Sequence, residues 1–282
     1  MIVSFCDVQT VFQLRMVSKQ HFDVANSVLR KRFNDLICPF VPQVDLFNDI
    51  LLTHGAVISG SLALYFFVPC TRWYPSDMDV FVPHSQFAAF THVLETNPAL
   101  RLVPYTKPIT DLWDLYVPWN PSDSLEIIDV RRYTTPTGRY IDAMQSRRDT
   151  PLSPLVECWT SLLTNFVSPN GCGSACPKPM FEGIGYSQDS LLTSRDRNYM
   201  LTYMTREFVK GQNFSFHPDD WGTWRDISYW KKREDYFCDS TGLVVDFSMR
   251  IDDQESSSLL PVEPLPDGWK LSIPFPTGAC YT

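Results

Sequence analysis

Residues 54–83 read HGAVISGSLALYFFVPCTRWYPSDMDVFVP, and this stretch decides the fold. A short apolar run leads into Ser-Gly-Ser at 59–61, and the following residues contain no Gly or Pro up to position 68. This order predicts a strand, a tight turn and a helix. The segment SDMDVFVP then alternates polar and apolar side chains between Pro75 and Pro83, which predicts a half-buried strand.

Two carboxylates lie on this second strand. Residues two apart on a strand project to the same face, so Asp77 and Asp79 lie side by side while Met78 and Val80 point into the core. Adjacent carboxylates repel each other, and one would take up a proton unless a cation lay between them. Hard divalent cations such as Mg²⁺ prefer oxygen ligands, and they bind carboxylate and phosphate oxygens together. The strand therefore predicts a metal site.

The start of the preceding helix predicts a phosphate site. Gly60 allows the backbone to come close to a ligand, because it has no side chain. The amides of Ser61 and Leu62 at the helix start can then donate to a phosphate.

Outward from this stretch, helices and strands alternate. The sequence predicts two helices over 8–37, broken near residues 18–20, further helices over 44–53 and 87–97, and strands over 112–117 and 125–133. Alternation of this kind indicates an α/β or α+β core. Further helices are predicted over 155–166 and 194–208, followed by a proline-rich tail.

The distribution of prolines divides the chain into four parts. We expect a helical segment over 1–42, a core over 43–150, a mostly helical or irregular extension over 151–258 and a proline-rich tail over 259–282. The total of 22 prolines in 282 residues predicts many ordered loops between these elements.

Composition and charge limit the binding partners and the cellular location that we expect for this protein. The net charge is −8 and the pI is near 5.1, so nothing draws the whole protein toward duplex nucleic acid. The N-terminus does not resemble a secretory signal, and the most apolar window is too short to span a membrane. We therefore expect an intracellular protein, cytoplasmic or nuclear, whose eight cysteines are reduced thiols.

The order Gly60-Ser61, then Asp77-x-Asp79, resembles the signature of the polymerase-beta-like nucleotidyltransferase superfamily. The resemblance implies an α+β core with a small mixed sheet. It also implies that Gly60 and Ser61 bind the triphosphate of a nucleotide and that Asp77 and Asp79 bind two magnesium ions. A third carboxylate on a later strand would complete the site, and Glu126 fits that pattern best, with Asp129 as the alternative.

The wider layout resembles a group of fungal nucleotidyltransferase-like proteins that carry half of an F-box motif at the N-terminus. The segment LRMVSKQHFDVANSVLRKRF at 14–33 is similar to the second half of an F-box, whose partner is a Skp-type adaptor protein. The first F-box helix, which grips the adaptor, is absent. A helical hairpin that caps the core explains the same segment.

Three functions are consistent with these patterns. The first is binding of a nucleoside triphosphate with Mg²⁺ and transfer of its nucleoside monophosphate to an acceptor, with pyrophosphate leaving. The second is a non-catalytic adaptor or interaction protein on a nucleotidyltransferase scaffold, and the third is a structural domain whose acids face solvent. The sequence does not identify the acceptor, although the net charge of −8 favours a small molecule or a protein.

Overall fold

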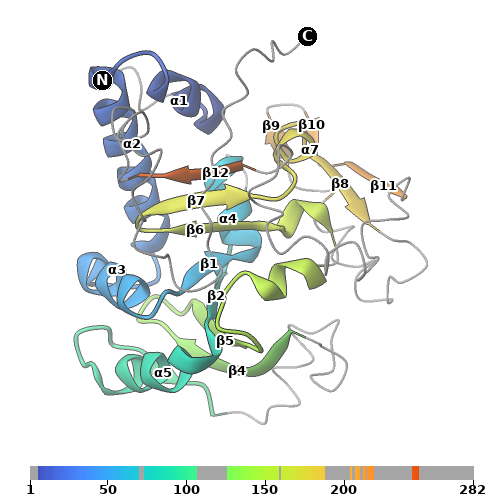
Figure 1. Ribbon diagram of the computed structural model, residues 1–282. Helices are drawn as coiled ribbons and strands as arrows, with labels where there is room; N and C mark the ends of the chain where they lie inside the picture. The colour runs from blue at the N-terminus through green and yellow to red at the C-terminus, as the bar shows by residue number, and fades with distance from the viewer. Residues whose placement is uncertain are drawn as a thin grey trace.

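The fold is α+β, with helices packed on a mixed sheet (Figure 1). The computed structural model describes residues 6–69, 73–106, 126–158, 160–187, 204, 207–209, 212–213, 215–218 and 243–247. The strand predicted over 112–117, the tail over 259–282 and most of the helix predicted over 194–208 lie outside these residues. Within them, no helix combines the length and the apolar character needed to cross a membrane.

The main sheet has eight strands in the order β12-β7-β6-β1-β2-β5-β4-β3. Their bounds are β1 Val57–Ser59, β2 Asp77–Val82, β3 Val103–Pro104, β4 Ile127–Thr134, β5 Tyr140–Ser146, β6 Asn165–Ser168, β7 Gly171–Ser174 and β12 Leu243–Asp246. Strands β2 and β5 are parallel, and every other neighbouring pair in this sheet is antiparallel. Strands β8 (Ile184–Ser187) and β11 (Ser215–Pro218), and strands β9 (Glu207–Val209) and β10 (Gln212–Asn213), form two further pairs.

The first five helices follow the predicted positions closely, and they are α1 Val8–Arg15, α2 Lys19–Ile37, α3 Val44–Thr53, α4 Gly60–Phe67 and α5 Phe87–Thr96. The short helix α7, Pro177–Phe181, was not predicted. The break between α1 and α2 has a local cause, because Ser18 is the N-cap of α2 and its side chain accepts from the His21 amide. Asp7 caps α1 in the same way, through the Thr10 amide.

The two faces of β2 have different surroundings. Met78, Val80 and Val82 are fully buried in the larger core cluster, together with apolar residues of α2, α3, α4 and α5. On the opposite face Phe81 belongs to a smaller cluster, whose members are Val57, Phe81, Met144, Leu155, Phe166, Ala175 and Cys176. Asp77 and Asp79 share this second face with Phe81, as the alternation predicted.

The helix predicted over 155–166 is wrong. That stretch contains two 3-10 turns, η3 (Ser153–Glu157) and η4 (Ser161–Leu163), and then strand β6. The side chains of Thr164 and Asn165 donate to the carbonyls of Ser161 and Leu162, which ends the turn. Strand β6 then pairs with β1, so the sheet extends past the boundary predicted at residue 150. Strands, and not helices, dominate the described residues of the predicted extension.

Candidate functional site

The site is built where strand β1 passes into helix α4. Ser59 ends β1 directly opposite Asp79 of β2, and α4 begins at the next residue. Gly60 has a φ of +65°, in the left-handed region that favours glycine. A Cβ atom at this position would lie 1.9 Å from Oδ2 of Asp79. The Asp79 carboxylate therefore lies directly against the first turn of α4, and only glycine fits beneath it.

The first turn of α4 has no side-chain cap. Ser59 occupies the N-cap position, but its hydroxyl donates to the Asn165 carbonyl at 2.8 Å and accepts no hydrogen bond from the helix amides. The first amides of a helix lack partners within the helix, and together they attract negative charge. Ser61, in this turn, is half-buried. The amides of this turn therefore receive no side-chain cap from Ser59, and the phosphate site expected at Gly60 and Ser61 stays a prediction.

The surroundings of Asp79 disfavour the ionised form of its carboxyl group. Its Oδ1 atom is buried and has no hydrogen-bond partner among the described residues. Burial raises the pKa of Asp79 well above its usual range, and the carboxylates of Asp77 and Asp142 raise it further, while Arg132 lowers it. A cation next to this carboxylate would stabilise its ionised form.

A third carboxylate lies beside Asp79, and it belongs to Asp142. Strands β2 and β5 are in parallel register with Asp79 opposite Asp142. Both Asp142 oxygens accept from Arg132 of β4, from Nε at 2.7 Å and from Nη2 at 2.8 Å, and both side chains are buried. Burial raises the pKa of Asp142, and the Arg132 ion pair opposes that shift. We call Asp77, Asp79 and Asp142 the acidic face.

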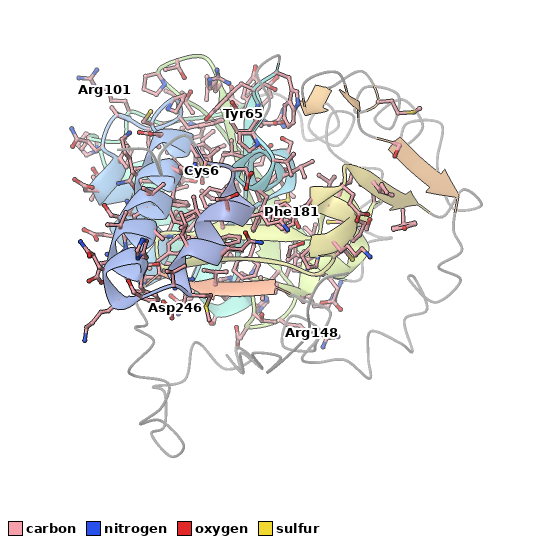
Figure 2. The ribbon with its side chains drawn as sticks, turned by 90° about the horizontal axis from the view of Figure 1, so that it is seen from above. Cys6, Tyr65, Arg101, Arg148, Phe181 and Asp246 are labelled. Atoms are coloured by element: carbon pink, nitrogen blue, oxygen red, sulfur yellow. The ribbon has the colours of Figure 1, made fainter. Side chains whose placement is uncertain are left out.

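Glu126 does not join the acidic face. It precedes β4, and its carboxylate accepts from Nε and Nη2 of Arg148 at 3.2 and 3.1 Å. Arg148 lies at the margin of the packed side chains (Figure 2). The Glu126 carbonyl accepts from the Arg147 amide, beyond the end of β5, so Glu126 lies well away from Asp142 along the sheet. The prediction of Glu126 as the third carboxylate therefore does not agree with the geometry.

Asp129, the alternative, is also displaced. It lies opposite Gln145, three positions beyond Asp142 on β5, which is about 10 Å along the strand. Its carboxylate is 3.7 Å from Arg131 and accepts from the Val130 amide. Strand β5 separates β4 from β2, so neither predicted residue is next to the Asp77–Asp79 pair.

Sequence reasoning missed Asp142 because it did not predict strand β5. The signal was weak, since YIDAMQS over 140–146 alternates only at residues 141–143, although it follows a turn that contains Pro136 and Gly138. A turn of this kind between two short runs rich in apolar residues is compatible with a hairpin. Recognition of that hairpin would have placed Arg132 opposite Asp142 as a cross-strand ion pair.

The donor set fits one magnesium ion better than two. Asp77 and Asp79 share a face, and the buried Oδ1 of Asp79 lacks a partner among the described residues, so these two carboxylates suit Mg²⁺ completed by phosphate oxygens. Arg132 already neutralises the Asp142 carboxylate, so Asp142 is a weaker ligand for a cation than Asp77 and Asp79. Consistent with this, the described part of the chain contains no group of three or more His, Cys, Asp or Glu residues suited to a metal. The two-ion site implied by the resemblance does not fit these residues.

The comparisons give little likeness to known proteins. No family model matches the chain, and no curated protein matches it. Among solved structures, it is similar to a CCA-adding enzyme in complex with CTP, at 13% identity and a TM-score of 0.38. The alignment covers 64% of this chain and 42% of that chain, so it spans less than half of the enzyme's length. A TM-score this low does not establish a shared fold, so the function proposed for this chain rests on its own residues.

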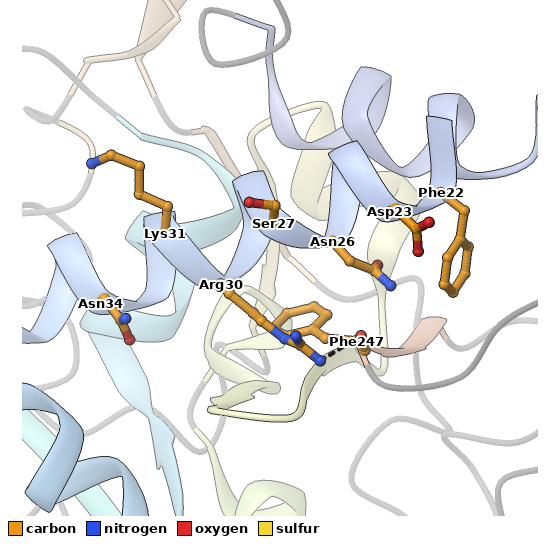
Figure 3. Close-up of a pocket in the computed structure, with 8 residues that line it drawn as sticks. All are labelled: Phe22, Asp23, Asn26, Ser27, Arg30, Lys31, Asn34 and Phe247. Carbon is orange, nitrogen blue, oxygen red and sulfur yellow. Dashed lines mark hydrogen bonds between the residues drawn. The ribbon is translucent and has the colours of Figure 1, made fainter. Parts of the chain in front are cut away.

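A hollow of about 450 Å³ lies elsewhere, along the outer side of α2 (Figure 3). Its lining residues are Phe22, Asp23, Asn26, Ser27, Arg30, Lys31, Asn34 and Phe247. Arg30 donates across it to the Phe247 carbonyl at 3.0 Å. None of its lining residues belongs to the acidic face, so the hollow and the candidate site are separate.

Proposed function

We propose that this protein binds a nucleoside triphosphate together with Mg²⁺ where α4 begins beside β2. One observation carries the proposal: the Asp79 carboxylate, with a buried oxygen that lacks a partner among the described residues, lies against the uncapped first turn of α4. An acidic group next to an anion-binding helix start favours a ligand that brings its own cation, and a magnesium triphosphate has that chemistry.

Each residue of the proposed site has a separate task. The backbone amides that follow Gly60 donate to the phosphates, and the absent side chain at Gly60 leaves room for the Asp79 carboxylate. Asp77 and Asp79 hold the cation from one strand face. Magnesium bound there would neutralise charge on the phosphates and favour attack at phosphorus.

We propose nucleotidyl transfer as the reaction that this binding serves. An acceptor hydroxyl would attack the α-phosphorus in line, its oxygen would bond to that phosphorus, the bond to pyrophosphate would break, and the hydroxyl proton would pass to water. The amides that follow Gly60, together with the cation held by Asp77 and Asp79, would position the triphosphate for this step. The acceptor proposed is a small molecule or a protein, because the net charge of −8 disfavours a polyanion.

The proposal is tested by calorimetric titration of the full chain with a non-hydrolysable nucleoside triphosphate, with and without Mg²⁺. The D77A/D79A double variant removes the two ligands, and E126A/D129A is the matched control, with the same change in net charge on a different strand. Binding is expected to need Mg²⁺, to disappear in D77A/D79A and to persist in E126A/D129A. Unchanged binding by D77A/D79A would overturn the proposal.

The second candidate is an adaptor role for the N-terminal hairpin. Its supporting observation is exposed apolar surface at the turn between α1 and α2, where Met16 is 52% and Val17 is 63% exposed. We propose a Skp-type adaptor protein as the partner in that case. Co-purification that depends on Met16 and Val17, tested with the M16S/V17S variant, checks this candidate.

A further inference from the structure

The acidic face contains its own cation. Arg132 lies in register opposite Asp142, which lies opposite Asp79, so one row of three neighbouring strands carries Asp79, Asp142 and Arg132. The guanidinium is 4.8 Å from the centre of the Tyr140 ring and donates two hydrogen bonds to one carboxylate. Bidentate pairing and stacking on an aromatic ring together fix a guanidinium in one orientation.

We propose that Arg132 takes the place of a second metal ion, so that the site holds one divalent cation, at Asp77 and Asp79. This inference rests on the proposed function and refines it. Arg132 neutralises Asp142 and supplies a fixed positive charge beside the ion. Its role is to position and neutralise, since both Asp142 oxygens already accept from it.

The buried ion pair disfavours a second ion at Asp142. Arg132 already balances the Asp142 carboxylate, and both side chains are buried. A second divalent cation at Asp142 would lie against the guanidinium, which repels it, or would displace the guanidinium. Displacement separates a buried ion pair, which is strongly unfavourable because it leaves a buried charge without compensation.

A second arginine–carboxylate pair in the protein is more exposed than the Arg132–Asp142 pair. Arg148 pairs with Glu126 through the same two nitrogen atoms, but the Arg148 side chain is 54% exposed, against 2% for Arg132. Ion pairs with an exposed partner contribute little to the stability of a fold. The buried pair lies beside Asp79, whose buried Oδ1 atom has no hydrogen-bond partner among the described residues.

The inference is tested by counting Mn²⁺ ions bound per chain, with electron paramagnetic resonance as the readout. We compare the wild type, R132M, the double variant R132M/D142L and the matched control R148M. R132M frees the Asp142 carboxylate, and R132M/D142L replaces the whole ion pair by apolar side chains, so that a folded variant is available if R132M is unstable. Calorimetric titration with magnesium tripolyphosphate measures phosphate binding in the same four proteins.

The expected count is one Mn²⁺ in the wild type and in R148M, two in R132M and one in R132M/D142L. Affinity for magnesium tripolyphosphate is expected to stay within about threefold of the wild type in R132M/D142L, because that variant removes one charge of each sign. Two Mn²⁺ ions in the wild type, or a single Mn²⁺ ion in a folded R132M, would overturn the inference while the proposed function stands. No Mn²⁺ bound to the wild type would overturn both.

Discussion

The contact between Gly60 and Asp79 gives the sharpest prediction, because the chain contains its own control. In G60A the new Cβ would lie 1.9 Å from Asp79 Oδ2 at a φ of +65°. Gly138, in the turn before β5, has a φ of +78°, but a Cβ there would meet nothing within 4 Å. G138A therefore measures the backbone cost alone, and G60A measures the backbone cost and the collision together.

The expected losses in the free energy of unfolding follow from the backbone conformation and from the collision. A non-glycine residue in the left-handed region costs about 1–2 kcal/mol, which is the expected loss in G138A. Forcing extra atoms into a packed site adds about 1–3 kcal/mol, so G60A is expected to lose roughly 2–5 kcal/mol of the free energy of unfolding. Urea denaturation with an unchanged m value measures both losses.

The same collision disappears when Asp79 is shortened. In D79A the nearest remaining atom of residue 79 is its Cβ, 3.4 Å from the new methyl group, which is an ordinary contact. G60A introduced into D79A is therefore expected to cost no more than G138A does in the wild type, giving a coupling energy of about 1–3 kcal/mol. Equal losses for G60A and G138A in the wild type would refute the placement of Asp79 against α4.

Three further predictions concern titration, ion pairing and thiol access. In metal-free buffer D79N is expected to have a higher free energy of unfolding than the wild type. This difference should widen as the pH rises above about 4, because the wild-type fold becomes less stable once Asp79 ionises more readily in the unfolded chain than in the folded one. A difference that narrows with rising pH would contradict this prediction. D142N is expected to lose about 3–5 kcal/mol of the free energy of unfolding, because it leaves the buried Arg132 guanidinium uncompensated. E126Q is expected to lose about 1 kcal/mol or less, because its partner Arg148 is half exposed. Chemical denaturation that ranks the two losses in the reverse order would contradict this prediction. Cys38 is exposed and Cys172 is fully buried with a raised pKa, so maleimide labelling followed by mass spectrometry should modify Cys38 in the native protein and Cys172 only after unfolding.

Local patterns predicted the centre of the fold well. Strand β2 lies between Pro75 and Pro83 with Met78 and Val80 buried, because proline and the alternation of side chains act over a few residues. Helix α3 has the predicted bounds for a similar reason, since its apolar positions recur at helical spacing.

Long-range pairing was not predictable in the same way. Strand β6 is a strand because β1 and β7 flank it, and β1 lies more than 100 residues earlier in the chain. Tertiary pairing of this kind overrides local helical preference. The sequence did not reveal that β5, and not β4, lies next to β2, because sheet order is not encoded in the spacing of acidic residues.

The most direct test of the central claim is a crystal structure of the full chain with Mn²⁺ and a non-hydrolysable nucleoside triphosphate, with the ion located by anomalous scattering. We predict one peak, coordinated by Asp77, Asp79 and phosphate oxygens, with the triphosphate over the first turn of α4 and Asp142 still paired with Arg132. Nucleotide bound elsewhere, or no peak between Asp77 and Asp79, would contradict the claim.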